Sequence, residues 1–331
     1  MKKIRQKNNI AITTGDPASI GPEVVLQALS SFNRSFDFTP VVIGDYEFLR
    51  GYYQNLFDKL NFKVSNADLP DISPGVPNFI NLKNVSLKTK PGTGSSDSGR
   101  ASLEYIDCSI DLWKKGIINA VSTAPVNKGF ICRAGYSFSG HTEYYARKTG
   151  NNEPFMMMYS DKYRVILVST HHRLFNLEKL ITYESILETI KTAASSIEKI
   201  DLSRPKLAVC GLDPHCGDNG AIGNFDNEVT VKAISDARAA GIDVSGPFAA
   251  DTVFIPGKWE NYSCVIAHYH DQGLIPFKML AFENGVNVTL GLPIVRTSAD
   301  HGTAYDIAGK GIAGFMSMKK AIIMADSLSA V

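Results

Sequence analysis

Short apolar runs alternate along the chain with stretches in which apolar residues return every three or four positions. The runs are rich in valine and isoleucine and end in glycine, proline or polar residues, a pattern typical of short buried strands. They predict strands at the start of NIAITTGDPASIGPEVVLQALSS and TPVVIGDYEFLRGYY, and within GIINAVSTAPVNKG, YRVILVSTHH, KLAVCGLDPH, YSCVIAHYH and VNVTLGLP.

Helical periodicity fills the intervals between these strands. In TYESILETIKTAASSIEKI, the apolar residues that share one helix face are Ile186, Ile190, Ala193 and Ile197. NEVTVKAISDARAAG predicts a further helix that ends at Gly241. Alternating strands and helices predict an α/β fold with a mainly parallel sheet. At 331 residues, the chain is long enough for two domains or one large α/β domain.

One segment, KPGTGSSDSGR at residues 90–100, is polar and rich in glycine and serine. This composition predicts a flexible surface loop or lid. A domain linker is disfavoured because the α/β pattern resumes directly after the segment.

The composition is that of an ordinary globular protein, with 44% hydrophobic and 20% charged residues. A formal net charge of +1 gives no electrostatic footprint for nucleic acid or an anionic membrane surface, so neither partner is expected. The basic N-terminus precedes an apolar run that is too short for a signal peptide, and no stretch approaches membrane-spanning length. We therefore expect a cytoplasmic protein.

Five cysteines, an odd number without C-x-x-C spacing, favour reduced thiols over a disulfide framework or a zinc finger. Cys216 follows a histidine and could be a soft metal ligand, although a small inert side chain is the simpler interpretation.

Three predicted strands share the same ending, an apolar run followed within a few residues by histidine, at His171, His215 and His270. Ligands of open parallel sheets bind beyond the carboxyl ends of the strands, so neighbouring strands would bring these imidazoles together. Three neutral imidazoles with one open position form a catalytic divalent-metal site. Each histidine could instead be an ordinary hydrogen-bonded loop residue. The pattern does not choose between His171 and His172, or between His270 and His268.

Groups suited to binding anions lie near these strand exits. Lys278 and Arg296 offer positive charge, and Asn287 follows in VNVTLG. In SGHTEYYAR, His141 and Thr142 lie near the start of a predicted helix, where backbone N–H groups attract anions. The lysine and arginine could equally be solvated surface charges, and the turn before the helix could be only an N-terminal cap.

The segment ADHGTAYDIAGKGIAG is dense in small residues, so its backbone can approach a ligand closely. It does not form a G-x-G-x-x-G motif after a strand, and the chain carries no convincing Rossmann fingerprint. By itself the segment could be only a tight loop.

Several of these motifs occur together in a known family. ITTGDPASIGPEVV, SGHTEYYA, VSTHH, CGLDPHCGDNG, GPFAADTVF, AHYHDQGLIPFK and VNVTLGLPIVRTSADHGTA closely resemble the 4-hydroxythreonine-4-phosphate dehydrogenase family of pyridoxal phosphate biosynthesis, in one order from about residue 10 to residue 314. Ser19 departs from the family pattern by replacing a glycine of the opening motif. The segment DHGTAYDIAGKGIA also looks like the adenosine-binding loop of isopropylmalate dehydrogenases, and Gly314 replaces the asparagine expected in that loop.

The resemblance implies a two-domain fold like that of isocitrate and isopropylmalate dehydrogenases, with a cleft between the domains. Residues 1–130 plus 280–331 are expected to form an α/β domain with the nicotinamide cofactor loop. Residues 131–279 are expected to form an α/β domain with the metal ligands and the dimer interface. A homodimer with shared active sites is implied.

Site residues follow from the resemblance, position by position. The metal ligands fall on His171, His215 and His270, and the substrate contacts on His141, Thr142, Lys278, Asn287 and Arg296. Cofactor contacts fall on His301, Gly302, Thr303 and Asp306. An acidic Asp306 would accept from a ribose 2′-hydroxyl and repel a 2′-phosphate, which favours NAD over NADP. Lys278 or Asp251 is the candidate base.

The implied reaction is NAD-dependent oxidation of the secondary hydroxyl of 4-phosphohydroxythreonine, followed by decarboxylation to 3-amino-2-oxopropyl phosphate. One divalent ion per site (zinc, magnesium, cobalt or manganese) would stabilise negative charge, and activity should fall at acidic pH as the histidines protonate. The nearest alternative is 4-phosphoerythronate dehydrogenase. An alternative of another class is a zinc hydrolase that uses the same histidines, and a non-catalytic binding protein is the third.

Overall fold

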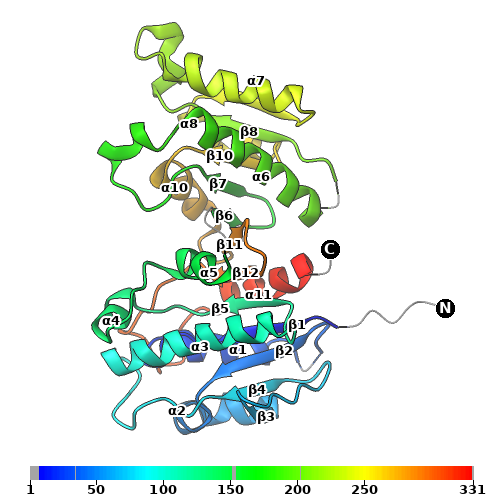
Figure 1. Ribbon diagram of the computed structural model, residues 1–331, viewed down its shortest axis with the longest axis vertical. Helices are drawn as coiled ribbons and strands as arrows, with labels where there is room; N and C mark the ends of the chain where they lie inside the picture. Colours follow the sequence, from blue (N-terminus) through cyan, green and yellow to red (C-terminus); the bar gives the residue numbers. More distant parts are fainter. Residues whose placement is uncertain (1–6, 34, 151–153, 202, 330–331) are drawn as a thin grey trace, which may run out of the picture. The chain divides into compact units, whose positions relative to one another are not determined.

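The computed structural model describes residues 7–33, 35–150, 154–201 and 203–329. The basic start of the chain, residues 1–6, lies outside the described residues. The chain divides into two compact units (Figure 1). Unit 1 comprises Met1–Asn152 and Leu292–Val331, and unit 2 comprises Glu153–Gly291.

These boundaries differ from the ranges expected from the sequence, 1–130 plus 280–331 and 131–279. Residues 131–152 fall in unit 1 because Tyr144 and Tyr145 of helix α5 (His141–Thr149) are buried in its core. Residues 280–291 fall in unit 2 because strand β11 (Val286–Leu290) pairs with β6 (Phe155–Tyr159) there. The division therefore follows packing that is not visible in the local pattern.

Unit 1 contains a parallel sheet with the strand order β3-β4-β2-β1-β5-β12. Its strands are β1 (Asn9–Thr13), β2 (Thr39–Gly44), β3 (Lys63–Asn66), β4 (Asn78–Asn81), β5 (Ala120–Thr123) and β12 (Val295–Ala299). Its helices are α1 (Gly21–Ser30), α2 (Tyr46–Leu60), α3 (Ser96–Lys114), α4 (Lys128–Arg133), α5 (His141–Thr149) and α11 (Met316–Ser329).

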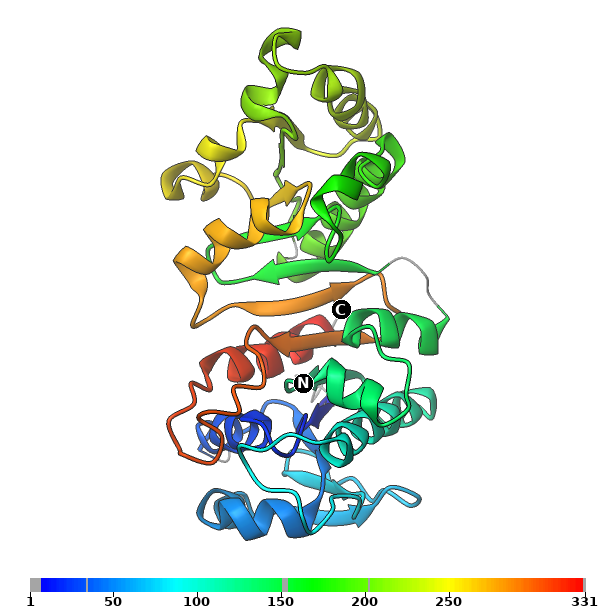
Figure 2. The same ribbon diagram turned by 90° about the vertical axis from the view of Figure 1, so that its left-hand side faces the viewer.

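Both faces of this sheet are covered, as expected for parallel strands. Side chains alternate along β1, so Ile10 and Ile12 pack with α1 and α11 while Ala11 packs with α3. Helices α1 and α11 lie on one side of the sheet and α3 on the other (Figure 2). The near-continuous apolar runs read from the sequence are thus explained by burial on two sides.

The polar segment 90–100 is only partly a loop. Helix α3 begins at Ser96, and the Ser95 side chain caps it by accepting from the N–H of Ser98, whose hydroxyl accepts from the N–H of Ser95 in return. The expectation of a flexible loop through Arg100 was wrong, because serine and aspartate favour helix N-termini as strongly as they favour loops.

Unit 2 contains a mixed sheet with the order β11-β6-β7-β10-β8-β9, in which β6 runs antiparallel to both of its neighbours. Its strands are β6 (Phe155–Tyr159), β7 (Arg164–Leu167), β8 (Leu207–Cys210), β9 (Val244–Phe248), β10 (Cys264–Ala267) and β11 (Val286–Leu290). Its helices and helical turns are η1 (Leu174–Lys179), α6 (Tyr183–Asp201), η2 (Pro214–Gly220), η3 (Asp226–Thr230), α7 (Val231–Ala239), α8 (Ala250–Val253), α9 (Pro256–Trp259) and α10 (His270–Ala281).

The helix face predicted for α6 is confirmed, since Ile186, Ile190, Ala193 and Ile197 are all fully buried. Helix α10 packs against β7 and β10 through Leu274 and Phe277. The adjacent strands β7, β10 and β8 are parallel and are the three that precede the candidate metal histidines. Their carboxyl ends therefore lie at one edge of this sheet.

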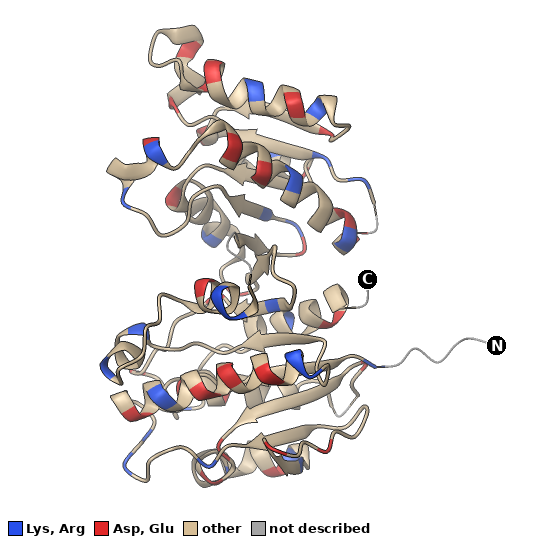
Figure 3. Ribbon diagram, in the orientation of Figure 1, with Lys and Arg blue, Asp and Glu red and all other residues tan. Residues whose placement is uncertain are grey.

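Acidic and basic residues are interspersed along helices such as α3 and α7 (Figure 3). None of the described helices combines the length and the apolar character needed to cross a membrane. All five cysteines are free.

Candidate active site

Two of the candidate metal ligands lie side by side in unit 2. The ring centroids of His171 and His270 are 5.5 Å apart, and both residues line a cavity of about 210 Å³ together with Thr170 and Tyr269. His270 donates from Nδ1 to the Asp271 carboxylate at 2.7 Å. This bond leaves Nε2 as the electron-pair donor, the arrangement in which a histidine binds a metal. The pair therefore fits a divalent cation.

His215, the third candidate, lies on an unusual turn. Five successive residues of η2, from His215 to Asn219, adopt left-handed backbone conformations with φ between 44° and 80°. Such conformations cost about 1–2 kcal/mol for a residue other than glycine, so surrounding contacts must hold them. Among the described residues, no three side chains of metal-ligating type come together in one chain.

A buried hydrogen-bond network holds the start of this turn. His268 donates from Nε2 to the carbonyl of Cys210 at 2.8 Å, and burial lowers the pKa of His268 to about 4, so the ring is neutral. Gln272 donates to the carbonyl of Gly211 at 2.9 Å and accepts from the N–H of His268. The buried Asp226 accepts from the N–H groups of residues 212 and 213.

This network separates the roles of the paired histidines. His268 is fully buried against Cys210, whereas His270 begins α10 and is partly exposed. His172 hydrogen-bonds through Nδ1 with Ser169 at 3.1 Å. Gln272 and Asp226 were not among the residues predicted from the sequence, because their hydrogen-bond partners lie on segments distant in the chain.

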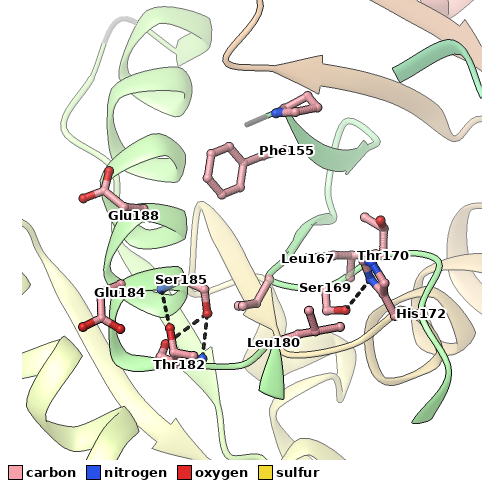
Figure 4. Close-up of a pocket in the computed structure, with 12 residues that line it drawn as sticks. Phe155, Leu167, Ser169, Thr170, His172, Leu180, Thr182, Glu184, Ser185 and Glu188 are labelled. Carbon is pink, nitrogen blue, oxygen red and sulfur yellow. Dashed lines mark hydrogen bonds between the residues drawn. The ribbon is translucent and has the colours of Figure 1, made fainter. Parts of the chain in front are cut away.

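A larger cavity, of about 420 Å³, adjoins this region (Figure 4). Phe155, Leu167 and Leu180 give it an apolar wall, and Glu184 and Glu188 of α6 lie at its side. It shares Thr170 and His172 with the smaller cavity. Its described lining includes none of the predicted site residues, whereas the smaller cavity is lined by His171 and His270.

The other candidates in unit 2 occupy separate elements. Lys278 lies on α10, eight residues after His270, which corresponds to about 12 Å along the helix axis. Asn287 lies on β11 with a buried Oδ1 that has no hydrogen-bond partner among the described residues. Asp251 is exposed on α8.

Unit 1 contains a buried cationic group on strand β12. Arg296 is 2% exposed and donates from Nη2 to the Thr123 hydroxyl at 2.7 Å, at the carboxyl end of β5. Burial lowers the pKa of Arg296 to about 10, so the guanidinium remains charged at neutral pH. A buried cation of this kind fits a carboxylate or phosphate.

His141 and Thr142 form the first turn of α5, and the preceding Gly140 makes no side-chain capping bond. Nε2 of His141 is buried without a hydrogen-bond partner among the described residues. Burial, reinforced by the charges of Arg296 and Lys128, holds the pKa of His141 well below its usual value. The positive surroundings therefore favour an anion, and Lys128, missed in the sequence, follows the exit of β5.

The loop proposed to bind the cofactor runs between β12 and α11. His301 donates from Nδ1 to the Gly302 carbonyl (3.3 Å), while its Nε2 is buried without a described partner. Thr303 accepts through its carbonyl from the N–H of Ile20, and Asp306 is exposed. An exposed carboxylate and a buried unpaired nitrogen fit a ribose hydroxyl and a polar ligand atom respectively.

The sequence reasoning missed two buried carboxylates that contact this loop, Asp16 and Glu23. Asp16 accepts from the hydroxyl of Tyr305 at 2.7 Å, and Glu23 accepts from the N–H groups of Gly309 and Ala313. Ser19, the departure from the family pattern, donates to the Asp16 carbonyl and accepts from the N–H of residue 21, so it supports the turn.

Comparisons with known proteins show which family the chain belongs to. The family model for the pyridoxal phosphate biosynthetic protein PdxA matches residues 37–325. A 4-hydroxythreonine-4-phosphate dehydrogenase of Trichlorobacter lovleyi is 40% identical over 98% of both chains. A protein of Oceanobacillus iheyensis named "Putative D-threonate 4-phosphate dehydrogenase" is 39% identical over 98% of both chains.

Solved structures give the same result. The 4-hydroxythreonine-4-phosphate dehydrogenase of Klebsiella pneumoniae superimposes with a TM-score of 0.81 at 34% identity, covering 98% of this chain and 100% of that chain. The expected α/β fold class is confirmed by this superposition, and the protein is an oxidoreductase. The chain belongs to the PdxA family of pyridoxal phosphate biosynthetic proteins, whose members act on a small phosphorylated substrate.

Proposed function

We propose that this protein uses NAD and a divalent cation to oxidise the secondary hydroxyl of 4-phosphohydroxythreonine, and that the product loses carbon dioxide to give 3-amino-2-oxopropyl phosphate. The family membership and the relatives named for this substrate support the proposal. When bound, NAD would accept a hydride, and the cation would stabilise negative charge on substrate oxygens.

One observation carries the assignment of the site. His141, Asn287 and His301 each have a buried polar atom without a hydrogen-bond partner among the described residues. A buried polar atom left unpaired costs about 1–3 kcal/mol, which a ligand that pairs with it recovers. We propose that, in unit 1, His141 pairs with substrate and His301 with the dinucleotide, and that Asn287 is a polar ligand contact of unit 2.

The substrate is anionic, and the proposed contacts match its charge. Arg296 would hold a carboxylate or phosphate with its planar fork, and Lys278 would add a point charge. Thr142 and the N–H groups of the first turn of α5 would donate to the same kind of group. These contacts orient the reacting carbon more than they activate it.

We propose that His171, His215 and His270 hold the cation and that a second copy of the chain completes the trio. The pair of imidazoles 5.5 Å apart supports the first part, and the lack of a three-ligand group within the described part of one chain supports the second. Imidazole suits zinc or cobalt, whereas magnesium and manganese would need additional oxygen ligands.

Exposed apolar side chains support the homodimer. Helix α10 and the residue after it expose Ile275, Met279, Leu280 and Phe282, with Met279 80% exposed. Leu174 and Phe175 on η1 are also exposed. Contiguous apolar side chains of this kind mark interaction surfaces. Because α10 begins at His270, an interface on this helix would bring the partner close to the metal pair.

Lys278 and Asp251 are the two candidates for the proton acceptor, which must reach the reacting hydroxyl directly or through one water molecule. Lys278 belongs to the helix that begins at His270, and Asp251 is exposed at the start of α8. The variants Lys278→Met and Asp251→Asn distinguish them when the pH dependence of kcat is recorded. Only the variant that lacks the base should lose the acidic limb of the pH profile.

Competing substrates differ at the second carbon. 4-Phosphohydroxythreonine carries an ammonium group there, whereas D-threonate 4-phosphate and 4-phosphoerythronate carry a hydroxyl. The relative named for D-threonate 4-phosphate makes this second candidate specific. A group that repels or fails to pair with the ammonium would favour the hydroxy acids.

The test is steady-state turnover of purified protein on all three substrates, with NAD and each of the four cations. We expect NADH and carbon dioxide from 4-phosphohydroxythreonine, and loss of most activity in His215→Ala. A higher kcat/KM on either hydroxy acid would reassign the substrate. Turnover without NAD would indicate the hydrolase, and no NADH with any cation would refute the proposal.

A further inference from the structure

The loop proposed to bind the cofactor, residues 300–314, has a backbone conformation that its internal hydrogen bonds do not fix. Ala304, Gly309 and Gly311 have φ of 39°, 76° and 73°, all in the left-handed region. For alanine this conformation is strained. The described hydrogen bonds within the loop are short-range turns, such as the one from the N–H of Ile307 to the carbonyl of Ala304. Contacts from outside must therefore fix the backbone.

Glu23 supplies the most direct of these contacts. It lies on the first turn of α1 and is 1% exposed. One carboxylate oxygen accepts from the N–H of Gly309 at 3.0 Å, and the other accepts from the N–H of Ala313 at 3.3 Å. A buried carboxylate is costly unless donors satisfy it, and here the loop backbone provides the donors.

Asp16 provides a second hydrogen-bonded contact to the loop, at Tyr305. Its carboxylate accepts from the Tyr305 hydroxyl at 2.7 Å and is itself held by the N–H of Ala18 and the hydroxyl of Ser98. The N–H of Ile20 donates to the carbonyl of Thr303 at 3.0 Å. The turn between β1 and α1 therefore makes hydrogen bonds to the loop at several points.

Asp306 lies between the two contacts in sequence, one residue after Tyr305 and three before Gly309. We infer that Glu23, assisted by Asp16, is a positioning residue for the dinucleotide: by pinning the Gly309 and Ala313 amides it sets the loop conformation that presents Asp306 and His301. This inference rests on the proposed function, in which the loop binds NAD. Glu23 itself is not proposed to touch the cofactor.

The test variant is Glu23→Gln, which keeps the size of the side chain but replaces one acceptor oxygen with a donor that faces a backbone N–H. Glu47→Gln, an exposed glutamate on α2 in the same unit, is the matched control. We measure NADH binding by fluorescence titration without substrate, together with kcat and both KM values of the full chain. The melting temperature of each variant is recorded in parallel.

We expect Glu23→Gln to weaken NADH binding and raise KM for NAD by at least about tenfold, the size of one charged hydrogen bond. The KM for the phosphorylated substrate should stay within about twofold of wild type. Glu47→Gln should match the wild type in every measurement. A purely structural role would instead lower the melting temperature and leave dinucleotide affinity unchanged, which would overturn the inference.

Tyr305→Phe provides a second variant in case Glu23→Gln does not fold. It removes only the hydroxyl that donates to Asp16, so we expect a smaller loss of NADH affinity, about threefold. Unchanged affinity in this variant would then overturn the inference. If the wild-type chain binds neither NAD nor NADH, the proposed function fails and the inference fails with it, a result distinct from either variant outcome.

Discussion

Three charged groups of unit 1 and two candidate metal ligands of unit 2 lie in different surroundings. In unit 1, Asp16, Glu23 and Arg296 are buried within a wholly parallel sheet unit and paired with hydroxyls or backbone amides. In unit 2, His171 and His215 are exposed, and His215 lies on a left-handed turn. Contacts within unit 1 therefore hold these three charged groups, whereas the exposed histidines of unit 2 are the ones that we propose to bind a cation.

This contrast has a physical basis. Burial strengthens charged hydrogen bonds, and a buried polar atom without a partner costs free energy until a ligand pairs with it. Exposed imidazoles are in contact with solvent, so binding a ligand costs them little desolvation. Removing groups from the two units should therefore have effects of different kinds, on metal content in unit 2 and on ligand affinity in unit 1.

The largest effect is expected for His171→Ala, compared with His172→Ala. Loss of an imidazole that binds the metal should lower kcat/KM by at least about 100-fold. It should also reduce the amount of bound metal, measured by elemental analysis. His172, which bonds to Ser169, should be dispensable within about threefold. Equal losses in both variants would remove His171 from the metal site.

Next in size is Arg296→Met, which probes unit 1. Loss of the buried cation should raise the KM for the phosphorylated substrate about 10- to 100-fold, while the melting temperature should change little because methionine fills the same space. The control is Arg147→Met, an exposed arginine over the Tyr144 ring. An unchanged KM in Arg296→Met would show that the anion binds elsewhere.

A double replacement on α10, Ile275→Glu with Met279→Glu, tests whether unit 2 is completed by a partner. Introducing charge into an apolar interface should weaken the dimer at least about tenfold, measured by sedimentation equilibrium, and activity should fall in parallel. Ile323→Glu on α11 of unit 1, at a residue that is 43% exposed, is the control. A dimer of unchanged strength would place the interface away from α10.

The smallest effect concerns acid stability. Because the pKa of His141 is lowered in the folded state, the unfolded chain binds more protons below about pH 6.5, and the free energy of unfolding should fall as the pH drops from 7 to 5. Urea titrations of wild type and His141→Asn at both pH values isolate this contribution. A pH slope that is identical in the two proteins would contradict it.

The sequence by itself determined the fold class and the helix faces, because alternation and helical periodicity are local and follow directly from burial. The residues Ile186, Ile190, Ala193 and Ile197 illustrate this. It also placed candidate ligands at strand exits, since the ends of parallel strands are fixed by the same local pattern. The loop expected through Arg100 failed because helix caps and loops use the same residues.

The tertiary structure alone decided which candidate is buried, paired or exposed. The contrast between His268 and His270, two residues apart, depends on the Cys210 carbonyl that a separate strand brings to His268. Asp16 and Glu23 accept hydrogen bonds from a loop nearly 290 residues away in sequence, and local composition could not predict these contacts. Hydrogen bonds between distant segments depend on how strands are ordered in the sheet, and that order is set only when the whole chain packs.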